Sequence, residues 1–529
     1  MQIAKPDIIA FPEWTECREK NGLDPLGMQV SSVNLYQDLL PGISNVTLRI
    51  RYYGLYAWLC DAYAKREGDT NPESWKRCLR RAEALYALIA YKHGLETGVA
   101  GTDWASRTIE NNTSDEIDFA TAAEPGSENY YLKQAWGAFG AAYGSQLGVI
   151  GITDPSDNHD IPLLSKNLGE PLALAFEQAL GPKAASFYRI IQRGKVNLSE
   201  LDDLAVLAPS EINRTSNERD NYEALLLGSA DSVDLAMISR RLSILLILKI
   251  TELLGRESKP DEVRWILYAG YDNVGRTLLP LPPAMESQRQ RWWIYQANDL
   301  CHVCLETLLK FALDYLGTFP TGLRFEQLIT SCVAQIVGEI KQKPMSWGAF
   351  LEVVEPAENS YADDNSESEW SLSRKILRNA DRGDATFCTP ETAWNAIRLL
   401  AILHKRALQK TNELAAEFSR FDQEHFRSLL TEIRFLERNR KEEFSTVLGK
   451  IIEERVVRRH LWVAMRKLRS QQDYTFLIEM DNGRIRLKDK DGPVFTNPRL
   501  GPTITFLRDI HLIDGQGLTP NGTRLASNV

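Results

Sequence analysis

Cysteine is scarce in this chain, with seven residues in 529. Their number is odd and their spacing irregular, which is not the pattern of a secreted disulfide scaffold, so a reducing compartment is expected. One pair, Cys301 and Cys304, has the Cys-x-x-Cys spacing of a zinc site, but no second pair at a suitable distance accompanies it. Both cysteines fall on the apolar face of an expected helix. Core packing is therefore the prediction, and no metal or other cofactor is expected.

Long apolar runs are also absent. The most apolar segment, Leu242–Ile250, contains Ser243 and Lys249 and is about half as long as a segment that spans a bilayer. Met1–Asp7 lack the continuous apolar stretch of a signal peptide. These absences predict a cytoplasmic protein that does not associate with membranes.

Sequence motifs of catalysis are missing as well. No Gly-x-x-x-x-Gly-Lys-Ser/Thr loop occurs, which argues against a P-loop ATPase. Glu339-Ile340-Lys341 matches the last element of a carboxylate-and-lysine nuclease, in which carboxylates hold the metal ion that activates water. That element requires a strand, whereas the segment before Glu339 has helical periodicity. No catalytic residue is predicted, and a nuclease with an unrecognised site stays open as an alternative.

The composition is that of an ordinary globular protein, with 43% hydrophobic and 25% charged residues. A net charge of −9 argues against a protein whose whole surface coats nucleic acid, but it permits a local basic patch. The length suits roughly two to four domains.

Helical periodicity dominates, so the predicted fold is mainly α: a multi-helix scaffold with a small C-terminal α+β domain. Glu352–Glu369 contains seven Asp and Glu and no Lys or Arg, which predicts an exposed boundary. The predicted divisions are an N-terminal helical domain with a loop-rich segment (1–170), a central helical domain (171–350), an acidic linker (351–384), a long helical connector (385–446) and a winged-helix-like domain (447–529).

The last of these divisions contains a basic helix, expected to begin at Arg455. At 100° per residue, five arginines share one face of this helix and Trp462 lies among them. The five are Arg455, Arg458, Arg459, Arg466 and Arg469. Residues 434–488 carry fourteen Lys and Arg against eight Asp and Glu, so positive charge is concentrated here within a negative chain.

Three interpretations of this arginine face are open. Guanidinium groups are planar forks of donors that suit phosphate, which predicts contact with a nucleic-acid backbone, double-stranded DNA in particular. An acidic protein surface would suit the same face. A solvated face that pairs with nearby glutamates is the third interpretation, and those glutamates are Glu442, Glu443, Glu453 and Glu454.

A hairpin and a second helix are predicted after the basic helix. Asn482-Gly483 lies between two short strand-like segments and accepts the positive φ angles of a tight turn. The order basic helix, hairpin, helix and the turn Leu518–Gly522 (LTPNG) resembles a winged-helix module. The resemblance implies that Arg499, Thr503 and Arg508 are exposed contact positions. Winged helices bind proteins as well as DNA, so the fold alone does not decide the partner.

Two segments carry a further resemblance. Leu39–Tyr53, with the sequence LLPGISNVTLRIRYY, resembles a motif in large bacterial proteins encoded in phage-defence and restriction gene clusters. Arg291–Gln296, with the sequence RWWIYQ, is similar to a second landmark of that family. The resemblance implies one component of a multi-gene anti-phage system, encoded beside an ATPase, helicase or nuclease. Together with the basic C-terminal module and the missing catalytic motifs, it leads us to expect a non-catalytic subunit that binds DNA or holds such a partner. A transcriptional regulator is a further alternative.

The first motif also has an interpretation from its residues alone. Arg49 and Arg51 precede several tyrosines, and such a group could contact a nucleotide. Ser44–Thr47 can cap a helix, however, and a capped amphipathic core helix explains the same residues. We favour the core interpretation.

Overall fold

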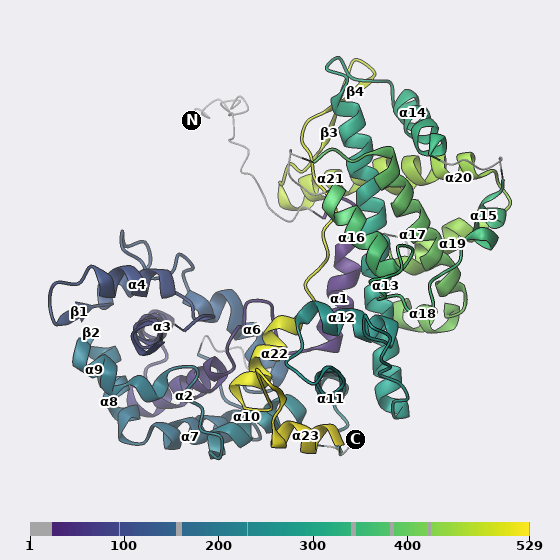
Figure 1. Cartoon of the computed structure of the whole chain (residues 1–529). Helices are drawn as coiled ribbons and strands as arrows, with labels where there is room; N and C mark the ends of the chain where they lie inside the picture. The colour runs from purple at the N-terminus through teal and green to yellow at the C-terminus, as the bar shows by residue number, and fades with distance from the viewer. Residues whose placement is uncertain are drawn as a thin grey trace, which may run out of the picture. The chain divides into compact units, whose positions relative to one another are not determined.

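The computed structural model describes residues 24–94, 96–154, 161–229, 231–339, 345–380, 386–421 and 425–527 (Figure 1). Most of these residues are helical and the strands are short antiparallel pairs, so the mainly α prediction is confirmed. Within the described ranges, every helix is too short or too polar to cross a bilayer.

The chain folds into two compact units, each assembled from separated segments. Unit 1 takes the described residues of Met1–Ser31, Asn298–Pro356 and Ser371–Phe495. Unit 2 takes those of Ser32–Ala297, Ala357–Trp370 and Thr496–Val529.

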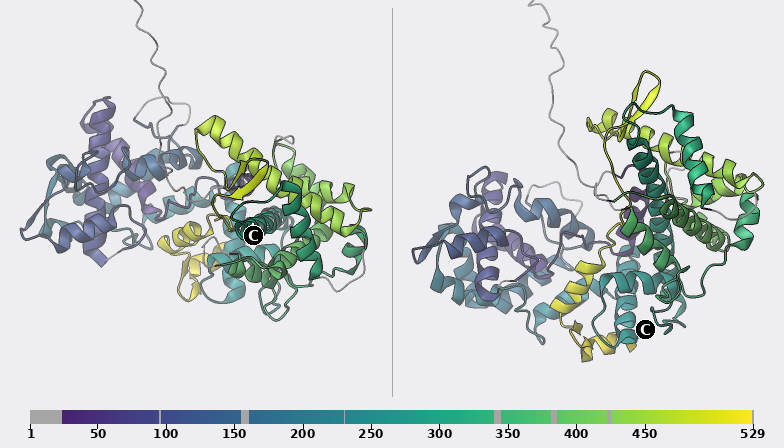
Figure 2. Two further views of the ribbon diagram at one scale, coloured as in Figure 1. Left: turned by 90° about the horizontal axis from the view of Figure 1, so that it is seen from above. Right: turned by 45° about the horizontal axis from the view of Figure 1, so that its top comes forward.

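Unit 2 is a helical assembly with two small strand pairs. β1 (Glu116–Asp118) pairs with β2 (Lys195–Asn197), and β5 (Ile513–Asp514) pairs with β6 (Gly517–Leu518). Its helices are α2 (Arg51–Arg66), α3 (Pro72–Gly94), α4 (Thr102–Glu110), α5 (Ala120–Ala123), α6 (Gly144–Ile150), α7 (Gly169–Leu180), α8 (Pro182–Arg193), α9 (Leu198–Asp203), α10 (Asn217–Leu227), α11 (Leu235–Leu254), α12 (Pro260–Ala269), α22 (Leu500–Asp509) and α23 (Pro520–Ser527). The yellow helices α22 and α23 lie beside α12 and α11, as both views of Figure 2 show.

Unit 1 has one hairpin, formed by β3 (Ile478–Asp481) and β4 (Arg484–Leu487), among its described residues. Its helices are α14 (Phe325–Gly338), α15 (Trp347–Val353), α17 (Pro390–Leu408), α18 (Thr411–Phe418), α19 (Leu429–Arg438), α20 (Phe444–Lys450) and α21 (Arg458–Gln471). Three helices have residues in both units: α1 (Gln29–Leu39), α13 (Pro283–Gly317) and α16 (Glu369–Asn379). The segment expected as one long connector, 385–446, contains α17, α18 and α19 as separate helices.

Helix α2 lies in the core of unit 2. Arg51 is fully buried; its Nε and Nη2 donate to the two carboxylate oxygens of Glu218 at 2.9 and 3.0 Å, and its Nη1 donates to two backbone carbonyls. Tyr52, Tyr53 and Tyr56 on the same helix are completely buried. The predicted core packing of the motif Leu39–Tyr53 is therefore confirmed, but the predicted cap is wrong: α2 begins after Ile50 without a side-chain cap, and Ser44 and Thr47 bond to each other instead.

A glycine allows the close packing around α2. A Cβ atom on Gly54 would overlap the hydroxyl of Tyr222 on α10 and lie 2.8 Å from the ring of Phe176 on α7. Glycine in a helix interior costs stability relative to alanine, roughly 1 kcal/mol. Here its missing side chain is what lets α2 approach both neighbours.

Part of the expected acidic linker is packed into unit 2. Tyr361 and Trp370 lie against Trp265 of α12, with ring centroids 6.1 and 5.2 Å away, and Glu369 is completely buried. Ser360 donates its hydroxyl to Glu369 at 3.1 Å. The predicted exposure is wrong for these residues, because two aromatic rings fix the segment despite its acidic composition. The chain does pass between the two units at both ends of Ala357–Trp370.

Cys301 and Cys304 are completely buried on α13, which confirms their predicted core packing. Burial raises the pKa of Cys304, so its thiol stays protonated.

The same helix carries a buried His302 whose ring lies 3.0 Å from Asp299 and 3.7 Å from Glu306. Burial opposes protonation of this ring, but the two carboxylates raise the pKa of His302 to about 9.

We expect Glu218→Gln to lower the free energy of unfolding by about 3 kcal/mol, because it leaves the buried Arg51 guanidinium without its counter-charge. Urea denaturation of the full chain measures the change. Glu73→Gln is the matched control, since Glu73 pairs with Lys76 on the surface of α3 and its side chain is 69% exposed. Equal stability of the two variants would show that the Arg51 pair does not anchor this core.

Candidate functional site

The basic helix begins later than the sequence predicts. Ile451–Val457 forms a π-helical segment and α21 starts at Arg458. A π turn contains more residues than an α turn, so positions before Arg458 do not continue the angular spacing of α21. Arg455 consequently lies in unit 1's interior, where its Nε donates to Glu432 at 2.8 Å. The prediction that Arg455 shares an exposed arginine face is wrong.

The inward side of α21 holds the start of the described chain. Arg459 is 8% exposed and donates from Nε to the carbonyl of Leu26 at 2.8 Å. Lys467 donates to the carbonyl of Asp24 at 3.2 Å. Arg459 therefore contributes to the attachment of α21, and its predicted place on an exposed face is also wrong.

His460 is the third inward contact. Its Nδ1 lies 3.2 Å from the carbonyl of Pro25, and its Nε2 accepts the backbone N–H of Leu477, just before β3, at 2.9 Å. Burial lowers the pKa of His460 to about 4, so the ring is neutral at pH 7 and one nitrogen remains free to accept. The ring thereby joins α21, Pro25 and the approach to the hairpin.

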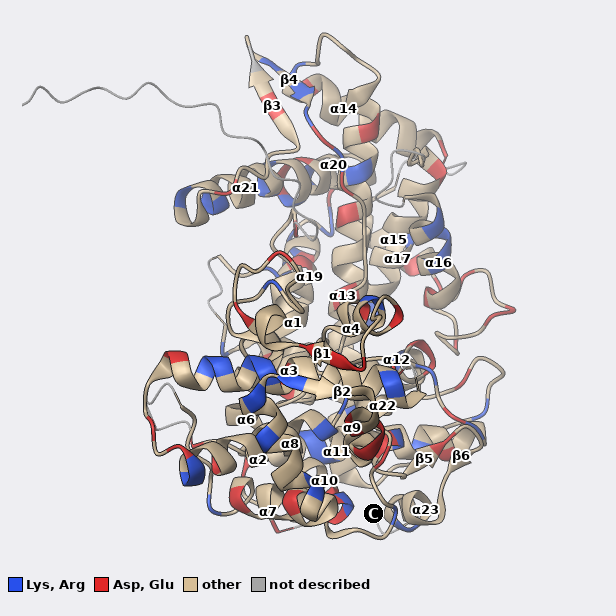
Figure 3. Ribbon diagram, turned by 90° about the vertical axis from the view of Figure 1, so that its left-hand side faces the viewer, with Lys and Arg blue, Asp and Glu red and all other residues tan. Residues whose placement is uncertain are grey.

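The outward side of α21 presents a stripe of exposed side chains. Figure 3 shows the Lys and Arg positions of this helix in blue on the ribbon. We name this the α21 stripe; its members, at helical spacing, are Arg458, Trp462, Met465, Arg466 and Arg469. The helix contains five Lys and Arg and no Asp or Glu. Three of the five arginines predicted to share one face of the basic helix are therefore exposed on the outward side of α21.

Aromatic rings lie beside three guanidinium groups along the helix. The Cζ atoms of Arg459 and Arg466 lie 4.5 and 5.2 Å from the ring of Trp462, which is 37% exposed. The Cζ atom of Arg458 lies 5.1 Å from the ring of Phe325 at the start of α14. Stacking restricts the orientation of each guanidinium, which lowers the entropy lost when it binds an anion.

The arginines of the stripe differ in their pairing. Arg458 pairs with Glu453, with 2.8 Å between Nη2 and Oε1. Arg466 and Arg469 have no ion pair with any residue that the structure describes. These two residues are the cations most available to a ligand.

The predicted hairpin is confirmed. Asn482 and Gly483 form its turn with φ angles of 49° and 74°, and Asp481 pairs with Arg484 in the register. The hairpin belongs to unit 1, together with α21. The backbones of Ile485 and Leu323 exchange hydrogen bonds of 2.7 and 3.0 Å, which tie β4 to the loop before α14.

The winged-helix arrangement is not confirmed. The hairpin and α21 belong to unit 1, whereas α22 belongs to unit 2. Thr503 is completely buried, and Arg499 is 7% exposed and donates to the carbonyl of Leu40 at 3.1 Å. Their predicted exposure is wrong. The buried face of α22 extends beyond its apolar stripe to Thr503, and Arg499, which directly precedes the helix, is held by its bond to Leu40. Arg508 is at the surface but pairs with Glu257.

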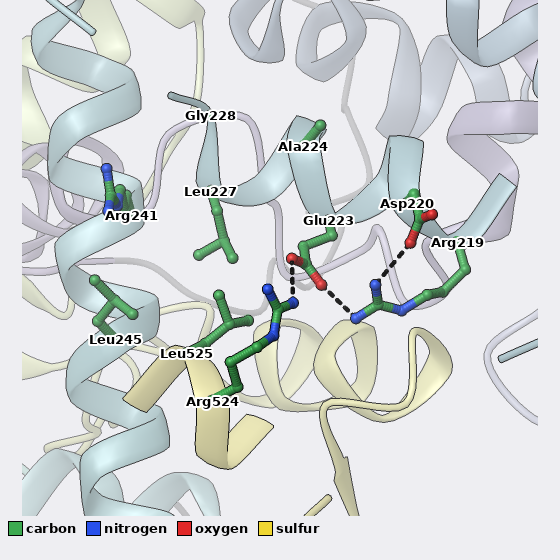
Figure 4. A pocket seen from close by; sticks show the side chains of 10 residues that line it. All are labelled: Arg219, Asp220, Glu223, Ala224, Leu227, Gly228, Arg241, Leu245, Arg524 and Leu525. Carbon is green, nitrogen blue, oxygen red and sulfur yellow. Dashed lines mark hydrogen bonds and ion pairs between the residues drawn. The ribbon is translucent and has the colours of Figure 1, made fainter. Parts of the chain in front are cut away.

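Unit 2 contains a cavity of about 350 Å³ between α10, α11 and α23 (Figure 4). Arg219 on one wall donates to Asp220 at 2.9 Å and pairs with Glu223, which also lies 3.5 Å from Arg524. Charges in this network largely compensate one another. The remaining lining consists of three leucines, Ala224, Gly228 and Arg241, with no nucleophile beside a base, so the cavity indicates no reaction.

Only Glu339 of the nuclease alternative lies within the described residues, and it is not on a strand. Glu339 directly follows the helix α14, and its backbone has helical φ and ψ angles of −74° and −15°. Ile340 and Lys341 lie outside the described residues. The α21 stripe is therefore the candidate site that the geometry supports best.

Comparisons of the chain with protein-family models, curated proteins and solved structures found no match. Any function assigned to the α21 stripe consequently depends on its geometry and charge.

We expect acid to loosen the attachment of α21. A histidine whose folded pKa is lowered contributes stability that is complete above its unfolded pKa of about 6.5 and is lost as the pH falls towards 4. His460 should therefore make the chain about 1 to 2 kcal/mol less stable at pH 5 than at pH 7. Urea denaturation at the two pH values measures the difference.

In the variant His460→Gln the glutamine side chain offers a donor and an acceptor, as the neutral ring does, but it does not titrate. The variant should therefore show a smaller loss of stability between pH 7 and pH 5. His93→Gln, at the surface of α3 beside Glu211, is the control and should leave it unchanged. Identical pH dependence in wild type and His460→Gln would refute the role of this ring. Some pH dependence of stability should remain in His460→Gln, because burial also lowers the pKa of His404 to about 4.

Proposed function

We propose that the chain is a non-catalytic subunit that binds the backbone of double-stranded DNA through the α21 stripe. The observation that carries this proposal is the pair of exposed arginines Arg466 and Arg469, which form no ion pair within the described part of the chain, on a helix whose opposite side is fixed to the protein. A fixed helix presents its cations without a large cost in conformational entropy.

The dimensions of the stripe suit a DNA backbone. Arg458 and Arg469 are eleven residues apart, so at 1.5 Å per residue the stripe is about 16 Å long. One DNA strand carries a phosphate every 3.4 Å along the helix axis, so this length corresponds to roughly five phosphates. Arginine donates to phosphate oxygens through two parallel N–H groups, which adds orientation to the electrostatic attraction.

The surroundings of Trp462 favour duplex DNA over single strands. Proteins that bind single strands stack unpaired bases on open aromatic faces. In this chain the guanidinium groups of Arg459 and Arg466 already lie near the indole ring. The ring therefore orients arginines, and the contacts it supports are with phosphate.

The cellular context that we propose is a bacterial anti-phage complex with an ATPase, helicase or nuclease subunit. Its support is the resemblance carried by Leu39–Tyr53 and Arg291–Gln296. Trp292 and Tyr295 in the second segment are 1% and 0% exposed. Both motifs contribute to the core of unit 2, so they support shared ancestry of the fold. In this proposal the DNA is contacted by the α21 stripe and not by these motifs.

The proposal predicts that the full chain binds a fluorescent DNA duplex with an affinity that falls steeply with salt. Replacing both unpaired arginines, in Arg466→Gln/Arg469→Gln, should weaken binding and reduce the slope of log K against log salt by about 2, because two phosphate contacts are lost. Fluorescence anisotropy between 50 and 200 mM salt, roughly the range in which such contacts are sensitive, measures both quantities.

The matched control is Arg77→Gln/Lys195→Gln, which removes two positive charges from the surface of unit 2. Arg77 and Lys195 have exposed side chains that pair with Glu124 and Glu116. This variant should bind like wild type. Equal weakening by both double variants would mean that net charge alone matters, and absence of duplex binding by wild type at low salt would overturn the proposal.

A further inference from the structure

An extended segment of unit 1, residues 488–495, lies along α13, and we name it the strap. Near its start, Lys490 pairs with Asp314, with 3.2 Å between Nζ and Oδ1. Near its end, the carbonyl oxygen of Val494 lies 2.9 Å from Nε2 of His302. The two contacts follow α13 in reverse order, so the strap runs antiparallel to the helix and covers it from Asp314 back to His302.

The face of α13 beneath the strap carries buried ionisable side chains. They follow one another at intervals of three or four residues, each at most 1% exposed: Asp299, His302, Glu306, Lys310 and Asp314. Lys310 and Asp314 pair at 3.0 Å, so their charges compensate. The other three form a group in which a histidine lies between two carboxylates.

His302 joins its own helix to the strap through its two ring nitrogens. Nδ1 lies 3.0 Å from a carboxylate oxygen of Asp299, one turn earlier on α13. Nε2 lies 2.9 Å from the carbonyl oxygen of Val494, which can only accept a hydrogen bond. Both neighbours are acceptors, so both contacts are favourable only when each nitrogen carries a proton. The geometry therefore requires the positively charged imidazolium.

A second carboxylate supports this charge. Glu306 lies 3.7 Å from Nε2 of His302, and its Oε1 accepts from the side-chain amide of Gln29 at 2.9 Å. Burial disfavours the charged ring, but Asp299 and Glu306 together raise the pKa of His302 to about 9. The ring is therefore charged at pH 7 as long as the strap covers it.

The other charged groups near Glu306 come from three elements. Asp24 accepts from the backbone N–H of Gln29, and Asp491 belongs to the strap. Lys467 on α21 donates to the carbonyl of Asp24 at 3.2 Å. Burial raises the pKa of Glu306 to about 7, and the carboxylates of Asp24 and Asp491 act in the same direction. Glu306 consequently becomes fully charged above pH 7, where its charge favours the imidazolium.

We propose that the strap is a pH-sensitive latch, which the imidazolium of His302 holds closed over α13 and which deprotonation of this ring releases. A neutral ring carries one N–H group, which can serve Asp299 or Val494 but not both. The remaining contact then places a nitrogen lone pair against an acceptor. Release of the strap exposes the ionisable row of α13 to water. This inference goes beyond the proposed function, because none of its contacts involves the α21 stripe.

The direction of the pH dependence follows from the raised pKa. With the strap open, the ring is solvated and titrates near the ordinary histidine pKa of about 6.5. His302 therefore stabilises the closed strap fully below about 6.5 and loses this effect as the pH rises through 9. Glu306 acts with the same sign at lower pH, below about 7. The strap should open at least about tenfold more often at pH 9 than at pH 7.

Hydrogen exchange of the full chain, with mass spectrometry of peptides that contain residues 488–494, tests the latch. Protection of these amides, corrected for the intrinsic exchange rate at each pH, should fall about tenfold or more between pH 7 and pH 9. Peptides of α17, in the same unit, should keep their protection. Unchanged protection of the strap would overturn the latch, and so would an equal fall in α17, which would mean general unfolding.

The variant Asp299→Asn separates the latch from a merely structural contact. An asparagine amide can donate to Nδ1, so a neutral His302 then satisfies both neighbours and the strap should stay protected at pH 9. The matched control is Asp203→Asn, because Asp203 pairs with Lys183 at the surface and its side chain is 72% exposed. The control should lose protection like wild type. The same loss in Asp299→Asn would overturn the role of the imidazolium.

Glu306→Gln provides a second variant in case Asp299→Asn does not fold. Its amide oxygen still accepts from Gln29, but one of the two carboxylates that favour the charged ring is gone. The pH at which the strap loses protection should move down by roughly one unit, because His302 then releases its proton more readily. An unchanged midpoint in this variant would overturn the latch.

Discussion

Buried guanidinium groups that donate to backbone carbonyls are the interaction on which both units depend. In unit 2, Arg240 is 1% exposed and donates to the carbonyls of Leu225, Leu226 and Pro41 at 2.9, 3.1 and 3.0 Å. Arg80 likewise donates to carbonyls between positions 123 and 135. A guanidinium has five donors, so it can satisfy several carbonyls where irregular segments meet, and those carbonyls would otherwise be buried without partners.

The same interaction divides the arginines of α21 between structure and proposed function. Arg459 fixes the helix by donating to carbonyls, and this attachment is what orients Arg466 and Arg469 outwards. The inward and the outward positions are occupied by the same residue type, so composition and net charge do not distinguish the structural arginine from the exposed ones. The distinction depends on which side of the helix meets residues 24–26, a contact between segments more than four hundred residues apart in the chain.

Local patterns predicted the local structure well. Asn482-Gly483 predicted its hairpin because a tight turn imposes positive φ angles on two adjacent residues, and the apolar neighbours of Cys301 and Cys304 predicted burial. Predictions failed where distant segments decide the outcome. The angular count from Arg455 did not anticipate a π-helical segment, and counting acids in Glu352–Glu369 gave no weight to Tyr361, whose ring packs on Trp265.

The proposed DNA contact also explains why so much positive charge is held together at a cost in stability. Burial and repulsion from neighbouring arginines lower the pKa of Arg459 to about 10, and a phosphate of the proposed DNA ligand would reduce that repulsion as it forms new hydrogen bonds. Part of the binding free energy then comes from strain relieved within the protein. A helix attached only through side chains at the surface would yield and let the arginines separate. The carbonyl contacts of Arg459 and His460 prevent this, so the attachment of α21 maintains the charge density that the proposed DNA contact would neutralise.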